Sequence, residues 1–308
     1  EDIRGILAAG EKRRKRRPTH RLGLSAPVAC ITVDRAMKEY VRYREAITDA
    51  RRVIVKVGSR VLVQKSGRPD RRCMAALIKD CAHIRRNGFE VVLVSSGAIG
   101  AGMEALGMTE RPTRVPDLQM AAAIGQTRLM AQYSELFGNQ GFQVGQMLLT
   151  HADFKHRVRL ANARRTMENL LRHNIIPIIN ENDVVADEEI RADLTLGDND
   201  LLAALVVKLI RADLLIMLTT VDGLREPTAS GRSRRVPCLE SITRQTFQLV
   251  TSSGSTISKG GMASKLRAAE AVVKTGCLAV IANGRTAGVI PAIMRGEDVG
   301  TLILSSGL

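Results

Sequence analysis

The chain has 308 residues, a formal net charge of +15 and 45% apolar residues, but only 3% aromatic residues and no Trp. This length allows one large domain or two small ones with an aliphatic core. The sequence contains no run of 18 apolar residues, so we expect no membrane span. The five cysteines show neither CxxC pairing nor a metal-ligand spacing, so we expect free thiols in a reducing cytoplasm. The positive charge is spread without interleaved aromatic residues, which disfavours nucleic acid as a partner.

Residues 1–36 differ in composition from the rest of the chain. They hold nine Lys or Arg against four Asp or Glu, and they include the basic run Lys12–Pro18. A basic tail or nuclear-type signal, an organelle transit peptide and an extension upstream of a start at Met37 are three alternatives for this composition. Because no helix or strand period is sustained, we expect this segment to be disordered.

From Met37 onward, apolar strand patterns alternate with amphipathic helix patterns. This alternation predicts an α/β fold with a mainly parallel sheet covered by helices. Pro177 would be awkward in a central strand. We expect helices at 37–50, 70–87, 116–137, 152–173, 199–211 and 262–275, strands at 52–57, 90–95, 142–149, 175–179, 213–218 and 278–282, and a closing edge strand at 301–304.

Four polar or glycine-rich segments follow predicted strands, and a fifth opens a predicted helix. In open parallel sheets, ligands gather beyond the carboxyl ends of the strands. Each segment alone also fits a solvated turn or a helix N-cap, but five in phase with the strands predict a site. We expect the five histidines to lie away from the strand ends. The segments are Lys56–Ser59, Ser95–Gly102, Asn180–Asp183, Gly197–Asp200 and Thr219–Gly223.

The run Ser258–Lys265 places two glycines, flanked by lysines, just before an expected helix at Met262. Main-chain N–H groups at a helix start favour a bound phosphate, although a plain glycine turn is the alternative. The spacing is not that of a Walker A loop. Lysines, glycine-rich helix starts and an acid-plus-amide cluster together favour phosphoryl transfer, which depends on positioning and charge.

The chain resembles the amino acid kinase family over roughly residues 51–304, and within it the members that act on glutamate. This resemblance implies an open, mainly parallel sheet sandwiched between helices, the same α/β class that the patterns predict. The matching strings are Val55–Ser59, Val94–Ile99, Ala123–Gln126, Val144–Thr150, Ile179–Asp183, Gly197–Asp200 and Gly260–Lys265.

The resemblance implies transfer of the ATP γ-phosphate to the side-chain carboxylate of L-glutamate, the first step toward proline, with Mg²⁺ accompanying the nucleotide. Lys56 and Lys265 would balance charge on the moving phosphoryl group, and Asp200 would orient them. No metal ligand is expected from the chain. Glutamate would be held by Ser96, Asn180, Asp183 and Asn199. ATP would contact Lys56, Thr219, Thr220, Lys259, Gly260, Gly261, Met262, Ala263, Ser264 and Lys265.

The resemblance further implies a cytoplasmic homo-oligomer, a dimer or tetramer, with feedback inhibition by proline through the segment Val184–Leu196. We expect a disordered basic extension at 1–36 and an amino acid kinase domain at 37–308. No PUA or reductase domain, which some members carry, is expected in the sequence.

The chain also departs from the family pattern. The segment Val184–Leu196 is longer than in the compact bacterial form, Thr219–Thr220 replaces the usual Thr-Asp, and Lys259 replaces a Thr. These changes could shift the nucleotide contacts. The alternatives are an acetylglutamate, aspartate or uridylate kinase, disfavoured by the string Ile179–Asp183, and a non-catalytic nucleic-acid-binding or regulatory protein on the same scaffold.

Overall fold

The computed structural model describes residues 43–64, 69–185, 198–228, 231–252 and 259–305. Residues 43–48 are helical. The elements that follow in chain order are β1 (Arg52–Val57), η2 (Ser59–Val61), α2 (Arg71–Arg86), β2 (Glu90–Val94), α3 (Ala98–Ala105), α4 (Val115–Gly138), β3 (Val144–Leu149), α5 (His151–Lys155), α6 (Arg157–Arg172), β4 (Ile176–Glu181), α8 (Asp198–Ile210), β5 (Leu214–Thr219), β6 (Arg225–Pro227), β7 (Ser233–Arg235), β8 (Cys238–Leu239), α9 (Arg244–Ser252), α10 (Lys259–Val273), β9 (Leu278–Asn283), α11 (Val289–Met294) and β10 (Thr301–Ile303).

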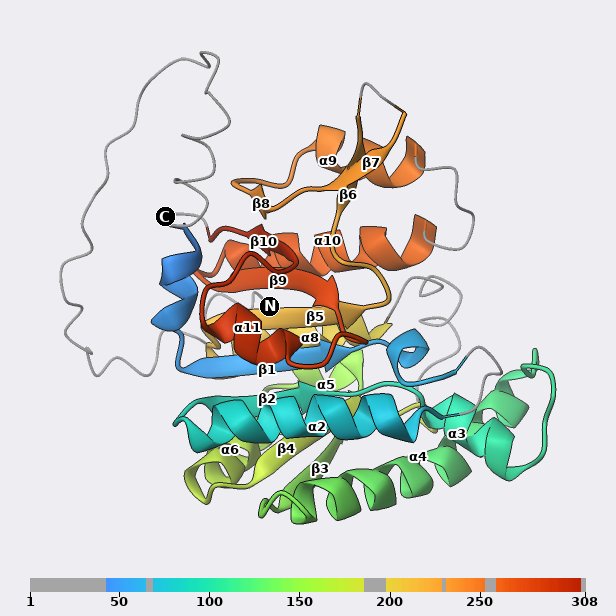
Figure 1. The fold of residues 1–308 in the computed structure, drawn as a ribbon. Helices are drawn as coiled ribbons and strands as arrows, with labels where there is room; N and C mark the ends of the chain where they lie inside the picture. Colours follow the sequence, from blue (N-terminus) through green and yellow to red (C-terminus); the bar gives the residue numbers. More distant parts are fainter. Residues whose placement is uncertain (1–42, 65–68, 186–197, 229–230, 253–258, 306–308) are drawn as a thin grey trace.

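One eight-stranded sheet runs through the molecule in the order β3-β4-β2-β1-β5-β9-β10-β8, with helices on both faces (Figure 1). Every neighbouring pair is parallel except β9 and β10. β6 and β7 form a separate antiparallel hairpin. The expected α/β class with a mainly parallel sheet is therefore confirmed.

The central strands are mainly apolar because helices cover both of their faces. In β1, residues 53–57 are all buried, and successive side chains alternate between the two cores. Val53 and Val55 join the core under α2, α4 and α11, whereas Ile54 joins the core under α6, α8 and α10. β1 is consequently fixed in the middle of the sheet, and its carboxyl end lies among those of β2 and β5.

The expected helix at 70–87 is confirmed as α2. The Asp70 side chain accepts a hydrogen bond from the Cys73 N–H at 3.0 Å, and Gly88, with a φ of 90°, follows the helix end. The helix buries one face that includes Met74 and Leu77.

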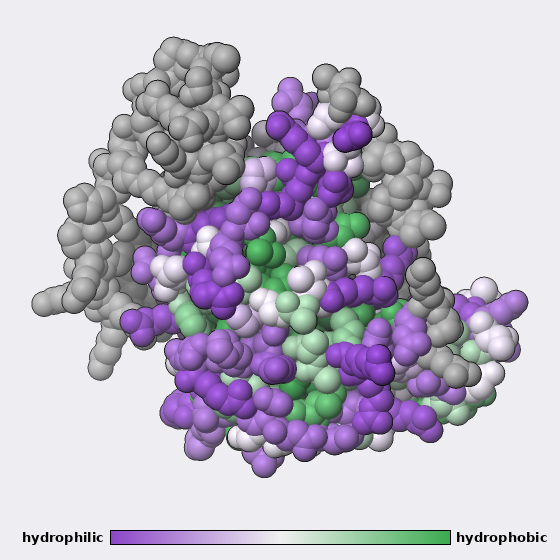
Figure 2. Space-filling model, viewed as in Figure 1, coloured by the Kyte–Doolittle hydropathy of each residue, from purple (hydrophilic) through white to green (hydrophobic). Residues whose placement is uncertain are grey.

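Hydrophilic residues cover much of the visible surface of the described chain, with hydrophobic ones in smaller areas between them (Figure 2).

Three expectations need adjustment. The helix expected at 152–173 is divided into α5 and α6, because His156 has an extended backbone with φ −100° and ψ 110°. The strand expected to close the edge, β10, is not the edge, since β8 pairs outside it. Pro177 does lie in an interior strand, and it is tolerated because the ladder of β4 with β2 begins only at Ile178.

No helix in the described part of the chain combines the length and the apolar character needed to cross a bilayer. The four cysteines within the described ranges, Cys73, Cys81, Cys238 and Cys277, are free thiols, as expected. Residues 1–36, for which disorder was expected, lie outside the described residues.

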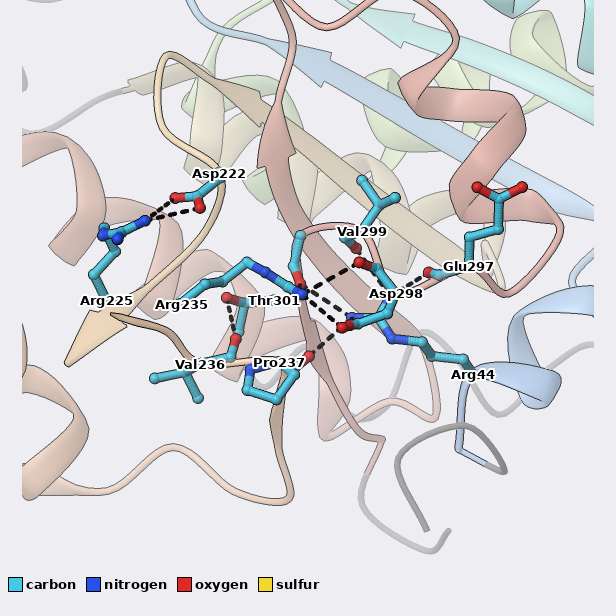
Figure 3. A network of polar contacts seen from close by, with 11 residues as sticks. Arg44, Asp222, Arg225, Arg235, Val236, Pro237, Glu297, Asp298, Val299 and Thr301 are labelled. Atoms are coloured by element: carbon cyan, nitrogen blue, oxygen red, sulfur yellow. Dashed lines mark hydrogen bonds and ion pairs between the residues drawn. The ribbon is translucent and has the colours of Figure 1, made fainter. Parts of the chain in front are cut away.

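A buried arginine joins the start of the described chain to its end (Figure 3). Arg44 has 1% relative exposure and lies in the helix at 43–48. Its guanidinium pairs with Asp298 at 3.0 Å, and Arg235 contacts the other oxygen of this carboxylate at 2.7 Å. Arg44 also donates at 2.9–3.0 Å to the main-chain oxygens of Pro237, Glu297, Val299 and Gly300. It therefore anchors the segments that lead into β8 and β10.

Replacing this arginine should destabilise the fold substantially. We predict that Arg44→Met lowers the free energy of unfolding by about 3 kcal/mol, because buried carbonyl oxygens lose their donors. Glu45→Ala, an exposed change on the same helix, should stay within about 0.5 kcal/mol of the parent. Denaturant unfolding of the three proteins measures both values, and equal stability for the two variants would contradict the anchoring role.

Candidate active site

Two buried lysines share one buried carboxylate at the carboxyl end of β1. Lys56 Nζ lies 2.5 Å from Asp200 Oδ1, and Lys265 Nζ lies 3.0 Å from Asp200 Oδ2. The three side chains are 5%, 8% and 1% exposed for Lys56, Lys265 and Asp200 respectively. Two ammonium groups around one carboxylate leave a net positive charge in a protected place, which suits an anionic ligand.

Three separate elements supply this Lys–Asp–Lys cluster. Lys56 is the fifth residue of β1, Asp200 lies in the first turn of α8, and Lys265 lies in α10. α10 begins at Lys259, so the glycine pair 260–261 lies inside its first turn and not ahead of the helix. Lys265 Nζ also donates to the Gly261 oxygen at 3.3 Å. Main-chain N–H groups in the first turn of a helix have no partner within the helix, which favours a bound anion.

The charges of the cluster determine the state of Asp200. Burial alone would raise the pKa of this carboxyl group, but the charges and hydrogen bonds of Lys56 and Lys265 bring the pKa below its ordinary value. Asp200 is therefore an ionised carboxylate at neutral pH. It holds two like charges close together that would otherwise repel.

Next to this cluster lies a chain of amide and hydroxyl groups. Asn199 Nδ2 donates to Ser96 Oγ at 3.0 Å and to Asn180 Oδ1 at 3.2 Å. Ser96 follows β2, Asn180 lies at the end of β4, and Asn199 precedes Asp200 in α8. The structure thus brings together three of the four residues expected to hold the acceptor, directly beside the charged cluster.

The fourth expected acceptor residue, Asp183, is half-buried and follows β4 by two positions. On the expected nucleotide side, Thr219 ends β5 and is half-buried, whereas Thr220 is exposed. Leu218 pairs with Val57, so these threonines lie at the same sheet edge as Lys56.

In α10, Ser264 is buried, and Met262 and Ala263 are half-buried. The side chain of Lys259 is outside the described residues. So is most of the segment Val184–Leu196, because the gap covers 186–197.

Sequence reasoning missed three residues around the site. Gln126 of α4 accepts a hydrogen bond from Asn180 Nδ2 at 2.8 Å, whereas the sequence indicates it only as part of the matching string Ala123–Gln126. The Tyr133 hydroxyl, fully buried, lies 2.7 Å from Ser95 Oγ. His151 follows β3, with Nδ1 3.7 Å from Glu181 Oε1, so the expectation that histidines lie away from the strand ends is wrong for this residue.

Within the described ranges, no three His, Cys, Asp or Glu side chains gather as a metal-binding group. Both oxygens of Asp200 are engaged by lysines. A magnesium ion at this site would therefore need most of its ligands from a bound molecule.

The fold is that of a recognised class of kinases. A model described as the amino acid kinase family matches residues 51–283. A carbamate kinase from Giardia lamblia bound to AMP-PNP has a similar fold, with a TM-score of 0.58 and 17% identity over 84% of this chain and 100% of that chain. An isopentenyl phosphate kinase from T. acidophilum, a product complex, has a TM-score of 0.56 and 14% identity over 82% of this chain and 99% of that one. At such identities these two structures show likeness of fold alone.

Curated relatives narrow the class. The glutamate 5-kinase of Pelobacter propionicus is 44% identical over 263 residues, which span 85% of this chain and 69% of that protein. The glutamate 5-kinase of Moorella thermoacetica is also 44% identical, over 85% of this chain and 68% of that protein. The chain belongs to the amino acid kinase family, and within it to the glutamate 5-kinases.

Removing the shared carboxylate should expose the repulsion that it now suppresses. We predict that Asp200→Asn lowers the free energy of unfolding by about 3–5 kcal/mol at pH 7, because two buried ammonium groups lose their counterion. Asp222→Asn, which breaks an exposed ion pair with Arg225, should cost at most about 1 kcal/mol.

The pH dependence follows from the lowered pKa of Asp200. A carboxyl group with a lowered folded-state pKa adds stability that is present above its unfolded pKa, about 3.9, and is lost as pH falls through the folded value. The gap between parent and Asp200→Asn should thus be constant from pH 6 to 8 and shrink in acid. A gap that grows below pH 4 would contradict this assignment.

Proposed function

We propose that this chain transfers the γ-phosphate of MgATP to the side-chain carboxylate of L-glutamate, giving L-glutamyl 5-phosphate for proline biosynthesis. The observation that carries the proposal is the adjacency of Asn199 and Asp200. One residue belongs to the amide chain with Ser96 and Asn180, and the next holds the two lysines. An acceptor subsite and an anion subsite therefore meet at the first turn of α8.

Phosphoryl transfer needs little covalent chemistry from the protein. It needs positive charge on the moving group and an acceptor held in line. In the proposed reaction, Lys56 and Lys265 stabilise the charge that spreads over the phosphoryl oxygens, and Asp200 fixes the direction of both ammonium groups. Their burial supports this role, because charge interactions are stronger where water is excluded.

The acceptor glutamate is proposed to bind along Ser96, Asn180, Asn199 and Asp183. ATP is proposed to extend from the lysines toward Thr219, Thr220 and the start of α10, where helix N–H groups favour phosphate. Magnesium is carried by the nucleotide phosphates in this proposal and neutralises their charge. No covalent enzyme intermediate is required.

Further properties are proposed on the family resemblance. One is that the protein is a cytoplasmic homo-oligomer, and the free cysteines of the described ranges support a reducing compartment. The other is inhibition by proline. Proline shares the α-carboxylate and amine of glutamate but has no side-chain carboxylate to phosphorylate. It could therefore occupy the acceptor subsite without reacting.

A coupled assay of ADP release, with and without L-glutamate, tests the proposal. We predict that turnover requires glutamate and that aspartate, N-acetylglutamate and UMP do not replace it. Turnover that depends equally on one of these acceptors would assign the chain to another activity of the family.

The two lysines should matter far more for turnover than a surface lysine. We predict that Lys56→Met and Lys265→Met each lower kcat about a hundredfold or more, since each removes about 3 kcal/mol of transition-state stabilisation. Lys274→Met, an exposed change just after α10, should leave kcat within about twofold. Because Lys56 and Lys265 are buried in regular elements, kinetics must be measured on variants shown to be folded by circular dichroism. Near-parental kcat in both would exclude the proposed role.

A further inference from the structure

Helix α4 contacts helix α3 through main-chain atoms and Asn180 through the side chain of Gln126. A Cβ atom added to Gly102 would lie 1.7 Å from the Ala121 oxygen, and one added to Gly125 would lie 1.8 Å from the Ala98 oxygen. α3 and α4 therefore cross backbone against backbone, which only glycine permits. This crossing fixes Gln126, the residue after Gly125, relative to the start of α3 beside Ser96.

Two turns further along α4, Tyr133 forms a hydrogen bond with Ser95, the residue that follows β2. Its hydroxyl lies 2.7 Å from Ser95 Oγ, and the ring is fully buried. Gln126 and Tyr133 are seven residues apart, so they lie on one face of the helix. Gln126 is consequently held in place from both sides, by the glycine crossing and by the tyrosine.

The orientation of the Asn180 side-chain amide is set by the main-chain N–H of Glu181, which can act only as a donor. The main-chain N–H of Glu181 donates to Asn180 Oδ1 at 3.0 Å. A main-chain N–H can only donate, so the atom facing it must be the oxygen. The Asn180 NH₂ group then faces Gln126 at 2.8 Å, and Gln126 must present its oxygen.

The same reasoning extends to Asn199. Because the Asn180 oxygen is fixed, Asn199 must offer its NH₂ group to it at 3.2 Å, and the same group donates to Ser96 Oγ at 3.0 Å. Asn199 Oδ1 is left over. It is buried and has no hydrogen-bond partner among the described residues. An acceptor of this kind suits a ligand that brings its own N–H donor.

We propose that Gln126 is a positioning residue: its oxygen holds the NH₂ group of Asn180, whose oxygen is fixed by the Glu181 N–H, so that Asn199 presents its own oxygen to the α-ammonium group of the substrate. This inference rests on the proposed function. A rotated Asn180 amide would turn Asn199 as well and place its NH₂ group against the ammonium. That rotation would turn the Asn180 NH₂ group toward the Glu181 N–H, and it would also require Gln126 to rotate its own amide in order to donate to Asn180.

The test uses three variants of the full chain. Gln126→Met keeps length and removes the acceptor, whereas Gln126→Glu keeps an acceptor at the same place. Gln132→Met is the matched control, since Gln132 is also half-buried on α4. Steady-state kinetics yield kcat and the KM values for glutamate and ATP. Glutarate, which lacks the amine, serves as a competitive inhibitor against glutamate.

Gln126→Met should raise the KM for glutamate about tenfold, the size of one lost hydrogen bond. Its kcat, its KM for ATP and its inhibition constant for glutarate should each stay within about twofold of the parent. Gln126→Glu should restore the KM for glutamate to within about threefold of the parent value, and Gln132→Met should match the parent.

Four outcomes would overturn the inference. In two of them, the KM for glutamate is unchanged in Gln126→Met, or it rises equally in Gln126→Met and Gln132→Met. In the other two, Gln126→Glu has as high a KM for glutamate as Gln126→Met, or the inhibition constant for glutarate in Gln126→Met rises as much as the KM for glutamate. A parent protein without glutamate-dependent turnover would instead refute the proposed function. It would also refute the claim that Asn199 binds the α-ammonium group of glutamate.

Discussion

The ion pairing of Asp200 with Lys56 and Lys265 is the interaction on which the rest of the site depends. One carboxylate is 1% exposed and holds two ammonium groups that are almost as deeply buried. Without it, two buried ammonium groups would lie together with no counterion, which is costly. The cluster also requires β1, α8 and α10 to converge, and α8 and α10 pack in the same core, on the face of the sheet to which Ile54 of β1 points.

The first turn of α8 connects this charged cluster to the amide chain. Asn199 and Asp200 are consecutive, so any shift of α8 moves both sets of contacts together. On the far side, the amide chain ends at Gln126 of α4, a helix held to α3 by two glycines. The proposed donor and acceptor subsites are thus linked by a short series of direct contacts from α10 to α4. Such rigid linkage suits a reaction that depends on positioning more than on covalent chemistry.

Much of this arrangement could be predicted from the sequence. Aliphatic strands alternate with amphipathic helices, and the polar segments after them are in phase, so Lys56, Ser96, Asn180 and Asp200 were expected at one sheet edge, where the structure has them. The rule that ligands gather at the carboxyl ends of parallel strands supplied that expectation. It needs only strand positions and no knowledge of distant contacts.

What could not be predicted depends on contacts between distant parts of the chain. Gln126 is one polar residue on a long helix, and nothing in its local pattern distinguishes it from Gln132. Arg44 bonds to residues near the other end of the chain, and a lone arginine in a basic segment gives no signal of burial. The break at His156 interrupts a helical pattern that continues on both sides, so periodicity alone misses it.

The central claim is that the two lysines around Asp200 receive the phosphoryl group while the amide chain holds glutamate. A crystal structure with a non-hydrolysable ATP analogue, magnesium and L-glutamate tests it most directly. We predict that Nζ of Lys56 and of Lys265 lies about 3 Å from γ-phosphate oxygens, with the glutamate side-chain carboxylate facing that phosphate. A γ-phosphate bound away from both lysines, or glutamate bound away from Asn180 and Asn199, would contradict the account.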